Sequence, residues 1–302
     1  MDPIKESLLK TSRKAKQEKF GKLVTFLCIL LIMVMVVAII LFVSLKGMAT
    51  FAVNHVSPFD FFFGVNWNPS AKPPQVGALP MFLGSFIVTI LAALIATPFA
   101  IGAATFMTEI APRTGKKILQ PVMELLVGIP SVVYGFVGLA VFVPITRHLF
   151  GGSGFGIFTA TLVLFLMVLP TITSMTTDAL NSVPRNYRES SLALGATQFQ
   201  TIYKVVWRAA TPGIMTAVVF GMSRAFGEAL AVQMVIGNAA LMPTSLTSPA
   251  ATLTSILTMG IGNSVSGTLE NNAIWSLALL LLLMSLVFNS LVRWIGKRSS
   301  LK

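Results

Sequence analysis

The chain has 302 residues, of which 55% are hydrophobic and only 11% are charged. Soluble globular domains carry about 25% charged residues, so this composition excludes an ordinary soluble domain and indicates an integral membrane protein. The formal net charge of +12 could suggest a nucleic-acid partner, but the positions of the basic residues decide its meaning. The single cysteine, Cys28, excludes a disulfide framework and a cysteine-based zinc site.

Six apolar runs are long enough to cross a bilayer, which takes about 20 residues. In chain order they are Leu23–Leu45, Leu79–Thr108, Ile118–Thr146, Leu149–Thr177, Ala209–Gly237 and Asn271–Val292. Because a spanning segment must satisfy its own backbone hydrogen bonds, we expect each run to form a helix. The sequence therefore predicts an all-α integral membrane protein with six transmembrane helices.

The apolar runs also divide the chain into regions. We expect a basic tail (1–22), a first transmembrane helix (23–45), an external loop (46–78), a core domain with five transmembrane helices (79–292) and a second basic tail (293–302). The first run is longer than the apolar part of a cleaved signal peptide, so we interpret it as a retained helix. Residues 238–270 are expected to form an external or partly re-entrant loop with a short helix near Ala250–Gly260.

Lysine and arginine residues are distributed unequally between the two sides of this arrangement. They gather in both tails, in the loop after the second run and in loop 179–208, whereas the other loops carry only Lys46, Lys72 and Arg147. By the positive-inside rule, both termini and loop 179–208 face the cytoplasm. The basic balance is thus a topology signal that requires no nucleic acid. For the N-terminal tail, contact with anionic membrane lipid remains an alternative to a solvated flank.

Loop 179–208 lies in the most polar part of the chain, "RNYRESSLALGATQFQTIYKVVWRAATPG". Pro184 can begin a helix, and Tyr187, Ser191 and Leu194 then follow at helical spacing. Gly195 can end that helix because glycine tolerates the left-handed conformation. A second helical run leads back to the membrane. The pattern predicts a helix–turn–helix at the cytoplasmic membrane face, and its apolar side chains indicate either docking of a partner or an amphipathic helix on the membrane surface.

The string "ESSLALGATQFQTIYKVV" resembles the EAA-loop signature of ATP-binding-cassette (ABC) importer permeases. Glu189, Gly195 and Val205 keep the pattern, while serines replace two alanines and Trp207–Arg208 replaces a Leu-Pro pair. The resemblance implies that the loop couples this chain to a separate ATPase. The coupling residues that it implies are Tyr187, Glu189, Ser190, Ser191, Leu194, Gly195, Ala196 and Thr197.

Two further strings, "ELLVGIPSVVYGFVGL" (124–139) and "SRAFGEALAVQMVIGN" (223–238), resemble the PstC family of phosphate-specific importer permeases. This resemblance implies the type I importer permease fold in a bacterial cytoplasmic (inner) membrane. It also implies a related PstA-like permease, two copies of a PstB-like ATPase and an external PstS-like phosphate-binding protein as partners. No phosphate-cradling G-x-x-x-x-G-K-[ST] motif is found, so ATP would be used by the partner and no cofactor would be bound by this chain.

Charged residues within the apolar runs are costly and are rarely without a role. Arg224 and Glu228 are four residues apart and should share one helical face. They could form an ion pair that fixes helix packing, or Arg224 could line an anion path in which Glu228 weakens phosphate binding. Glu124 lies near the cytoplasmic end of the third run and is interpreted as a packing or gate residue. His55 and His148 are isolated, so we expect no metal site.

Two other functional classes stay open at this point. One is an ABC permease for a different solute, and the other is an ion-gradient-driven carrier or channel, which would leave the EAA-like loop unexplained. The apolar runs contain no nucleophile–base pair and no cluster of metal ligands. We therefore expect no catalytic residues and no enzymatic activity in this chain.

Overall fold

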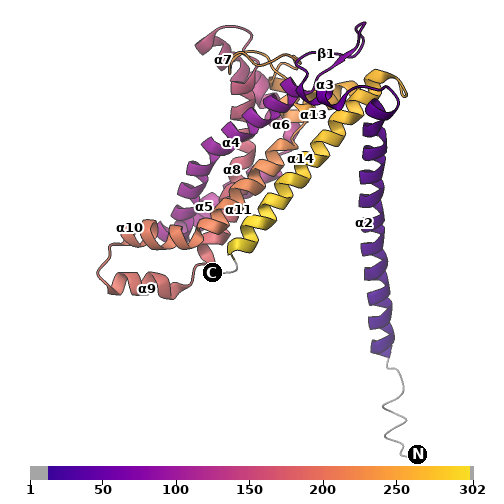
Figure 1. Cartoon of the computed structure of the whole chain (residues 1–302). Helices are drawn as coiled ribbons and strands as arrows, with labels where there is room; N and C mark the ends of the chain where they lie inside the picture. The colour runs from indigo at the N-terminus through magenta and orange to yellow at the C-terminus, as the bar shows by residue number, and fades with distance from the viewer. Residues whose placement is uncertain (1–12, 300–302) are drawn as a thin grey trace, which may run out of the picture. The chain divides into compact units, whose positions relative to one another are not determined.

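The computed structural model describes residues 13–299, and Figure 1 shows its elements. Residues 1–12 of the expected N-terminal tail and residues 300–302 of the C-terminal tail lie outside the described residues. The chain divides after Lys46 into two compact units. The first unit contains most of helix α2 (Arg13–Ala52), which includes the expected first span and is apolar around its whole circumference across that span. Such a helix suits a lipid-facing membrane span.

The second unit contains five more helical segments that are long and apolar enough to cross a membrane. They are Leu79–Ile110, Ser131–Phe150, Ile157–Asn181, Gln198–Phe226 and Leu269–Leu291. With Gln17–Ala52 of α2, the described part of the chain has six candidate spans. The prediction of an all-α membrane protein with six spans is confirmed.

Three of these five spans contain a short π-helical segment. The elements of the spans are α4 (Leu79–Thr105), η1 (Phe106–Ile110), α6 (Ser131–Val137), η2 (Gly138–Phe142), α7 (Val143–Phe150), α8 (Ile157–Asn181), α10 (Gln198–Thr201), η3 (Ile202–Val206), α11 (Trp207–Phe226) and α14 (Leu269–Ser299). Single π-turns often occur at functional sites. Here η3 lies within loop 179–208, and η1 lies against that loop at the same end of the unit.

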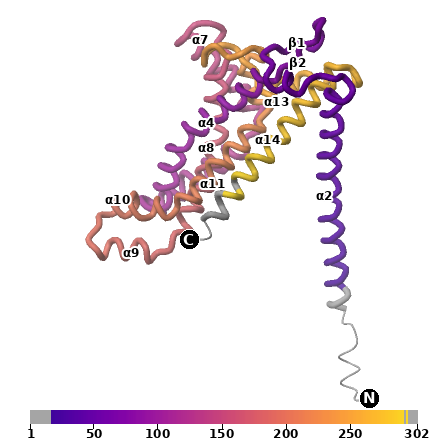
Figure 2. The backbone as a smooth tube through the Cα atoms, in the orientation of Figure 1, coloured from indigo at the N-terminus to yellow at the C-terminus, as the bar shows by residue number. Residues whose placement is uncertain are grey.

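Helix α8 packs between α4 and α11, and α11 also packs against α14, as Figure 1 and Figure 2 both show. The buried face of α4 carries alanines at every fourth position: Ala92, Ala96, Ala100 and Ala104. Small side chains let helix backbones approach closely, which favours association inside a membrane. Gly221 of α11 serves the same purpose, because an added Cβ would lie 2.6 Å from Ile172 of α8.

The two ends of this bundle differ. At one end, called the hairpin end, α9 (Arg185–Ala193) and α10 project as a helical hairpin (Figure 1). The opposite end holds α3 (Pro58–Phe63), α7, α13 (Leu253–Ile261) and two short antiparallel strands, β1 (Trp67–Asn68) and β2 (Gln75–Val76), in which Trp67 faces Val76. Helix α13 confirms the short helix expected near Ala250–Gly260.

The third expected helix, Ile118–Thr146, is wrong as a single element. Helix α5 (Pro112–Gly128) ends before Pro130, and the membrane span begins only at Ser131. Ile129 is extended, with φ −69° and ψ 126°. Proline disfavours helical backbone at the preceding residue, so this break had a signal in the sequence.

Two other expected boundaries are displaced. The fourth span begins at Ile157 rather than at Leu149. The fifth begins at Gln198 within the polar loop and ends at Phe226, after which Gly227 separates it from the short helix α12 (Leu230–Val235). The second arm of the hairpin is therefore continuous with a membrane-spanning helix.

Candidate functional site: a helical hairpin and a membrane-embedded arginine

The turn of the hairpin follows from its sequence. At the end of α9, Gly195 adopts the left-handed region with φ +83°. Its backbone N–H donates to Leu192 O at 2.9 Å, and the N–H of Ala196 donates to Ser191 O at 3.2 Å. These two bonds form a Schellman motif, which satisfies carbonyls that the end of a helix leaves without donors. The prediction that α9 ends at Gly195 is confirmed.

The second arm begins with a capping box. The N–H of Gln200 donates to the Thr197 hydroxyl at 3.2 Å, and the N–H of Thr197 donates to the Gln200 side chain at 3.0 Å. Ser191 and Thr201 join the two arms through a hydroxyl contact of 2.9 Å. The path of the hairpin is therefore set by hydrogen bonds between residues close in the sequence.

The outer face of the hairpin is apolar and aromatic although the segment as a whole is polar. Leu194 is 89% exposed, Phe199 75% and Tyr203 54%. The rings of Phe199 and Tyr203 stack with centroids 6.3 Å apart, and Tyr187 is half-exposed on the other arm. Exposed apolar groups in such a cluster are typical of a surface that binds a partner. Glu189 and Ser190 are also exposed.

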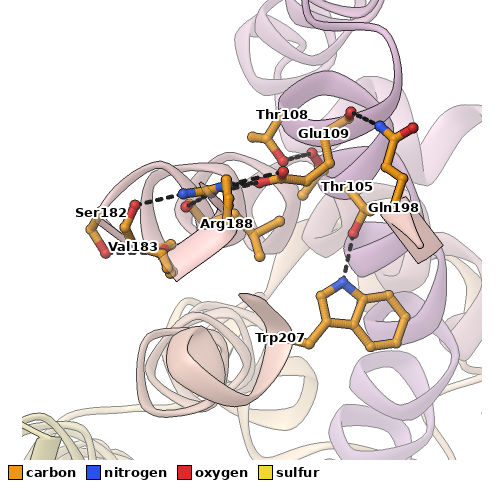
Figure 3. Close-up of polar contacts among 11 residues, drawn as sticks. Thr105, Thr108, Glu109, Ser182, Val183, Arg188, Gln198 and Trp207 are labelled. Carbon is orange, nitrogen blue, oxygen red and sulfur yellow. Dashed lines mark hydrogen bonds and ion pairs between the residues drawn. The ribbon is translucent and has the colours of Figure 1, made fainter. Parts of the chain in front are cut away.

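The root of the hairpin holds an ion pair that sequence reasoning missed. The guanidinium of Arg188 contacts both carboxylate oxygens of Glu109, with a closest approach of 2.6 Å, as Figure 3 shows. The two residues are 79 positions apart, so no local spacing could pair them. The available signal was Glu109 itself, an acidic residue directly after an apolar run.

Arg224 and Glu228 do not form the ion pair that their spacing suggested. Helix α11 ends at Phe226, so the two residues do not share a helical face, and that expectation is wrong. Arg224 instead donates to the hydroxyl of Thr171 on α8 at 2.8 Å. The Glu228 carboxylate accepts from the backbone N–H of Ala231 at 3.2 Å. Arg224 remains exposed on this chain.

Glu124 lies on α5, beside a polar cleft of about 420 Å³ between α5 and α8. Its carboxylate accepts from the side chain of Gln120 at 3.0 Å. The polar residues that line the cleft are Lys116, Gln120, Glu124, Thr173, Ser174, Thr177, Asp178 and Asn181. Pro170 also lines the cleft and directly precedes Thr171, the partner of Arg224. The cleft therefore lies close to the membrane-embedded arginine.

Potential metal ligands do not gather in the structure. Within residues 13–299, no group of three or more histidine, cysteine, aspartate or glutamate side chains could hold a metal ion. His55 precedes α3, and His148 lies in α7.

The fold and the hairpin together define a class of protein: a multi-pass helical membrane protein with an exposed apolar hairpin at one end. The family model of the binding-protein-dependent transport system inner membrane component matches residues 96–301. The chain belongs to this family, whose members are transmembrane permease subunits of ABC importers and are not enzymes. Such permeases work with an ATPase and a substrate-binding protein.

Two curated relatives align along most of the chain. The probable ABC transporter permease protein YqgH of Bacillus subtilis (strain 168) is 52% identical over 298 residues, covering 98% of this chain and 96% of YqgH. The phosphate transport system permease protein PstC of Pasteurella multocida (strain Pm70) is 34% identical over 285 residues, covering 88% and 86% of the two chains.

Two solved structures share the fold at lower identity. The inward-facing MetNI methionine ABC transporter superposes with a TM-score of 0.53 at 22% identity, over 72% of this chain and 94% of that one. An amino acid ABC transporter with histidines gives a TM-score of 0.51 at 18% identity, over 72% and 92%. These similarities establish the type I importer permease fold for this chain.

Proposed function

We propose that this chain is the permease subunit of an importer that moves inorganic phosphate across the bacterial cytoplasmic membrane. The observation that carries the proposal is the similarity to PstC proteins, including 34% identity to the Pasteurella multocida subunit over nearly the whole chain. Membership of the ABC importer family removes the gradient-driven carrier as an alternative. The solute of the 52% identical relative is not part of its name, so the choice of solute needs a direct test.

Arg224 supports an anion as the solute. A charged side chain in the membrane costs about 2.5–3.5 kcal/mol on insertion scales, so an exposed arginine there requires an aqueous path or a protein partner. Its hydrogen bond to Thr171 directs the guanidinium toward α8, which lines the polar cleft. Glu124 and Asp178 in that cleft would keep anion binding weak, as transit requires.

The hairpin supports a separate ATPase as the partner that drives transport. Its exposed face around Leu194, Gly195 and Phe199 would enter a cleft of a PstB-like ATPase subunit. The complex would contain two copies of that subunit, one bound to this chain and one bound to a PstA-like permease. ATP would bind only to those subunits. A PstS-like protein would deliver phosphate at the opposite end of the bundle.

The proposed orientation can be tested by cysteine labelling. After Cys28→Ser, single cysteines at Ser70 near β1 and at Asn186 on α9 lie at opposite ends of the second unit (Figure 1). In intact cells, a membrane-impermeant maleimide is expected to label the first variant and to label the second only after permeabilisation. Labelling of both in intact cells would contradict the topology.

The function is tested by purification and uptake. The tagged chain, extracted in mild detergent, is expected to co-elute with an ATPase, a second permease and a binding protein. Reconstituted vesicles should then accumulate labelled phosphate only with ATP inside. An excess of unlabelled phosphate should abolish the signal, whereas sulfate, molybdate and amino acids should not. ATP-dependent uptake of another solute in place of phosphate would identify a permease for that solute.

A further inference from the structure

The ion pair at the root of the hairpin joins three elements. Arg188 extends from α9 to Glu109 in η1, and the same guanidinium donates to the backbone carbonyls of Val183 at 2.7 Å and Leu180 at 2.9 Å. Leu180 lies in the last turn of α8, and Val183 follows that helix. One arginine therefore ties the hairpin to the ends of both α4–η1 and α8 (Figure 3).

This arrangement satisfies the charges of a pair that is removed from solvent. The side chain of Glu109 is 9% exposed and that of Arg188 is 21% exposed. The planar guanidinium contacts both carboxylate oxygens at once, and two such parallel contacts define an orientation that a single contact leaves free. Arginine at a helix end also complements the carbonyls that have no helical donor there. The pair is therefore suited to hold a fixed geometry.

The second arm of the hairpin is tied to the same place. Gln198 of α10 donates its side-chain N–H to the backbone carbonyl of Glu109 at 3.0 Å. Farther along, the indole N–H of Trp207 donates to the hydroxyl of Thr105 at 3.0 Å. Both contacts appear in Figure 3. Glu109 thus contacts α9 through its side chain and α10 through its backbone, so neither arm can swing without breaking a bond to η1.

We propose that Glu109 and Arg188 are positioning residues that make the hairpin one rigid body with the adjoining ends of α4 and α8. The inference rests on the proposed role of the hairpin as the ATPase docking element, and it names the route by which a displacement of the hairpin reaches the membrane. Arg188 passes the displacement to the end of α8. The same helix lines the polar cleft and holds Thr171, the partner of Arg224.

The rigid body is tested by a distance measurement that involves neither phosphate nor an ATPase. In the full chain with Cys28→Ser, spin labels are placed at Phe99 on α4 and Leu192 on α9, which are 60% and 50% exposed. Pulsed electron paramagnetic resonance in lipid nanodiscs is expected to give one narrow distance distribution. Glu109→Gln keeps the shape of the side chain and removes its charge. This variant should add a second population of label-to-label distances, displaced by about 5 Å, the rise of one helical turn.

The chain offers a matched control for this measurement. Glu18 and Lys22 form an ion pair with a distance of 2.7 Å whose side chains are 66% and 75% exposed. Exposed pairs contribute little, so Glu18→Gln should leave the distribution unchanged. If Glu109→Gln does not reach the membrane, Arg188→Lys serves as the second variant, because it keeps the positive charge but loses the bidentate contact to Glu109. Arg188→Lys should broaden the distance distribution as well. A broad wild-type distribution, or an unchanged one in the variants, would overturn the proposal.

A second readout examines coupling in the complete transporter. Glu109→Gln should keep the ATPase bound and hydrolysing while solute imported per ATP falls about tenfold, within the usual range of coupling between sites. An unchanged ratio with a broadened distance distribution would overturn the transmission role. Absence of any ATPase from the wild-type complex would instead refute the proposed function, and the distance result would still decide whether the rigid body exists.

Discussion

Replacing Gly195 by valine is expected to uncouple solute uptake from ATP hydrolysis while membrane insertion is preserved. Gly195 has φ +83°, and left-handed backbone costs an ordinary L-residue about 1–2 kcal/mol, with β-branched side chains fitting worst. That penalty alone reduces the population of the native turn by roughly 5–30-fold. An added Cβ would meet no atom of this chain within 4 Å, so the effect arises from the backbone and leaves the core intact.

Two further variants separate this effect from general damage. Asparagine tolerates the left-handed region, so Gly195→Asn should keep most of the uptake if the turn geometry matters more than the side chain. Gly267 has φ +86° and equally open surroundings, but it lies between α13 and α14 at the opposite end. Gly267→Val should leave co-purification of the ATPase unchanged. Normal uptake by vesicles that contain Gly195→Val would argue against the coupling role.

Replacing Arg224 by alanine is expected to reduce phosphate uptake by roughly tenfold to hundredfold, because a hydrogen bond to a charged group contributes about 1.5–3 kcal/mol. Removal of a membrane-embedded charge makes insertion easier, so reduced uptake could not be attributed to poor insertion. The Thr171 hydroxyl that loses its partner can still donate to a carbonyl of its own helix. The measurement is the initial rate of labelled phosphate uptake in reconstituted vesicles.

The controls for Arg224 distinguish its charge from its position. Arg224→Lys keeps the cation and should retain more uptake than the alanine variant. Arg113→Ala removes an exposed arginine at the start of α5, outside the cleft, and should transport normally. The amounts of each variant in the membrane and of ATPase bound to it should match wild type. Wild-type uptake by Arg224→Ala would remove this residue from the path.

Local features of the hairpin could be predicted because its turn depends on neighbouring residues. Gly195 ends α9 and Thr197 begins α10 through bonds that reach no more than five positions along the chain. The six spans were predictable for a similar reason, since apolar length alone determines which segments can cross a bilayer. The helix break before Pro130 also had a local signal in the sequence. The apolar run Ile118–Thr146 is nevertheless long and hydrophobic enough to suggest one continuous helix.

The partners of the charged residues could not be predicted in this way. The spacing of Arg224 and Glu228 suggested a pair within one helix, but the helix ends between them and Arg224 contacts Thr171 instead, 53 positions away. Glu109 received no role from the sequence, yet the structure places it against both arms of the hairpin. Both cases depend on which helix faces meet.

The sequence by itself determined that this chain is a helical membrane protein, that it has six candidate spans and how its hairpin turns. These properties follow from hydropathy and from backbone preferences within a few residues. The tertiary structure alone decided that Arg188 holds Glu109 and that Arg224 reaches α8. The physical reason is that a charged side chain can pair only with the groups that helix packing brings within its reach, and the packing of α4, α8 and α11 sets that choice.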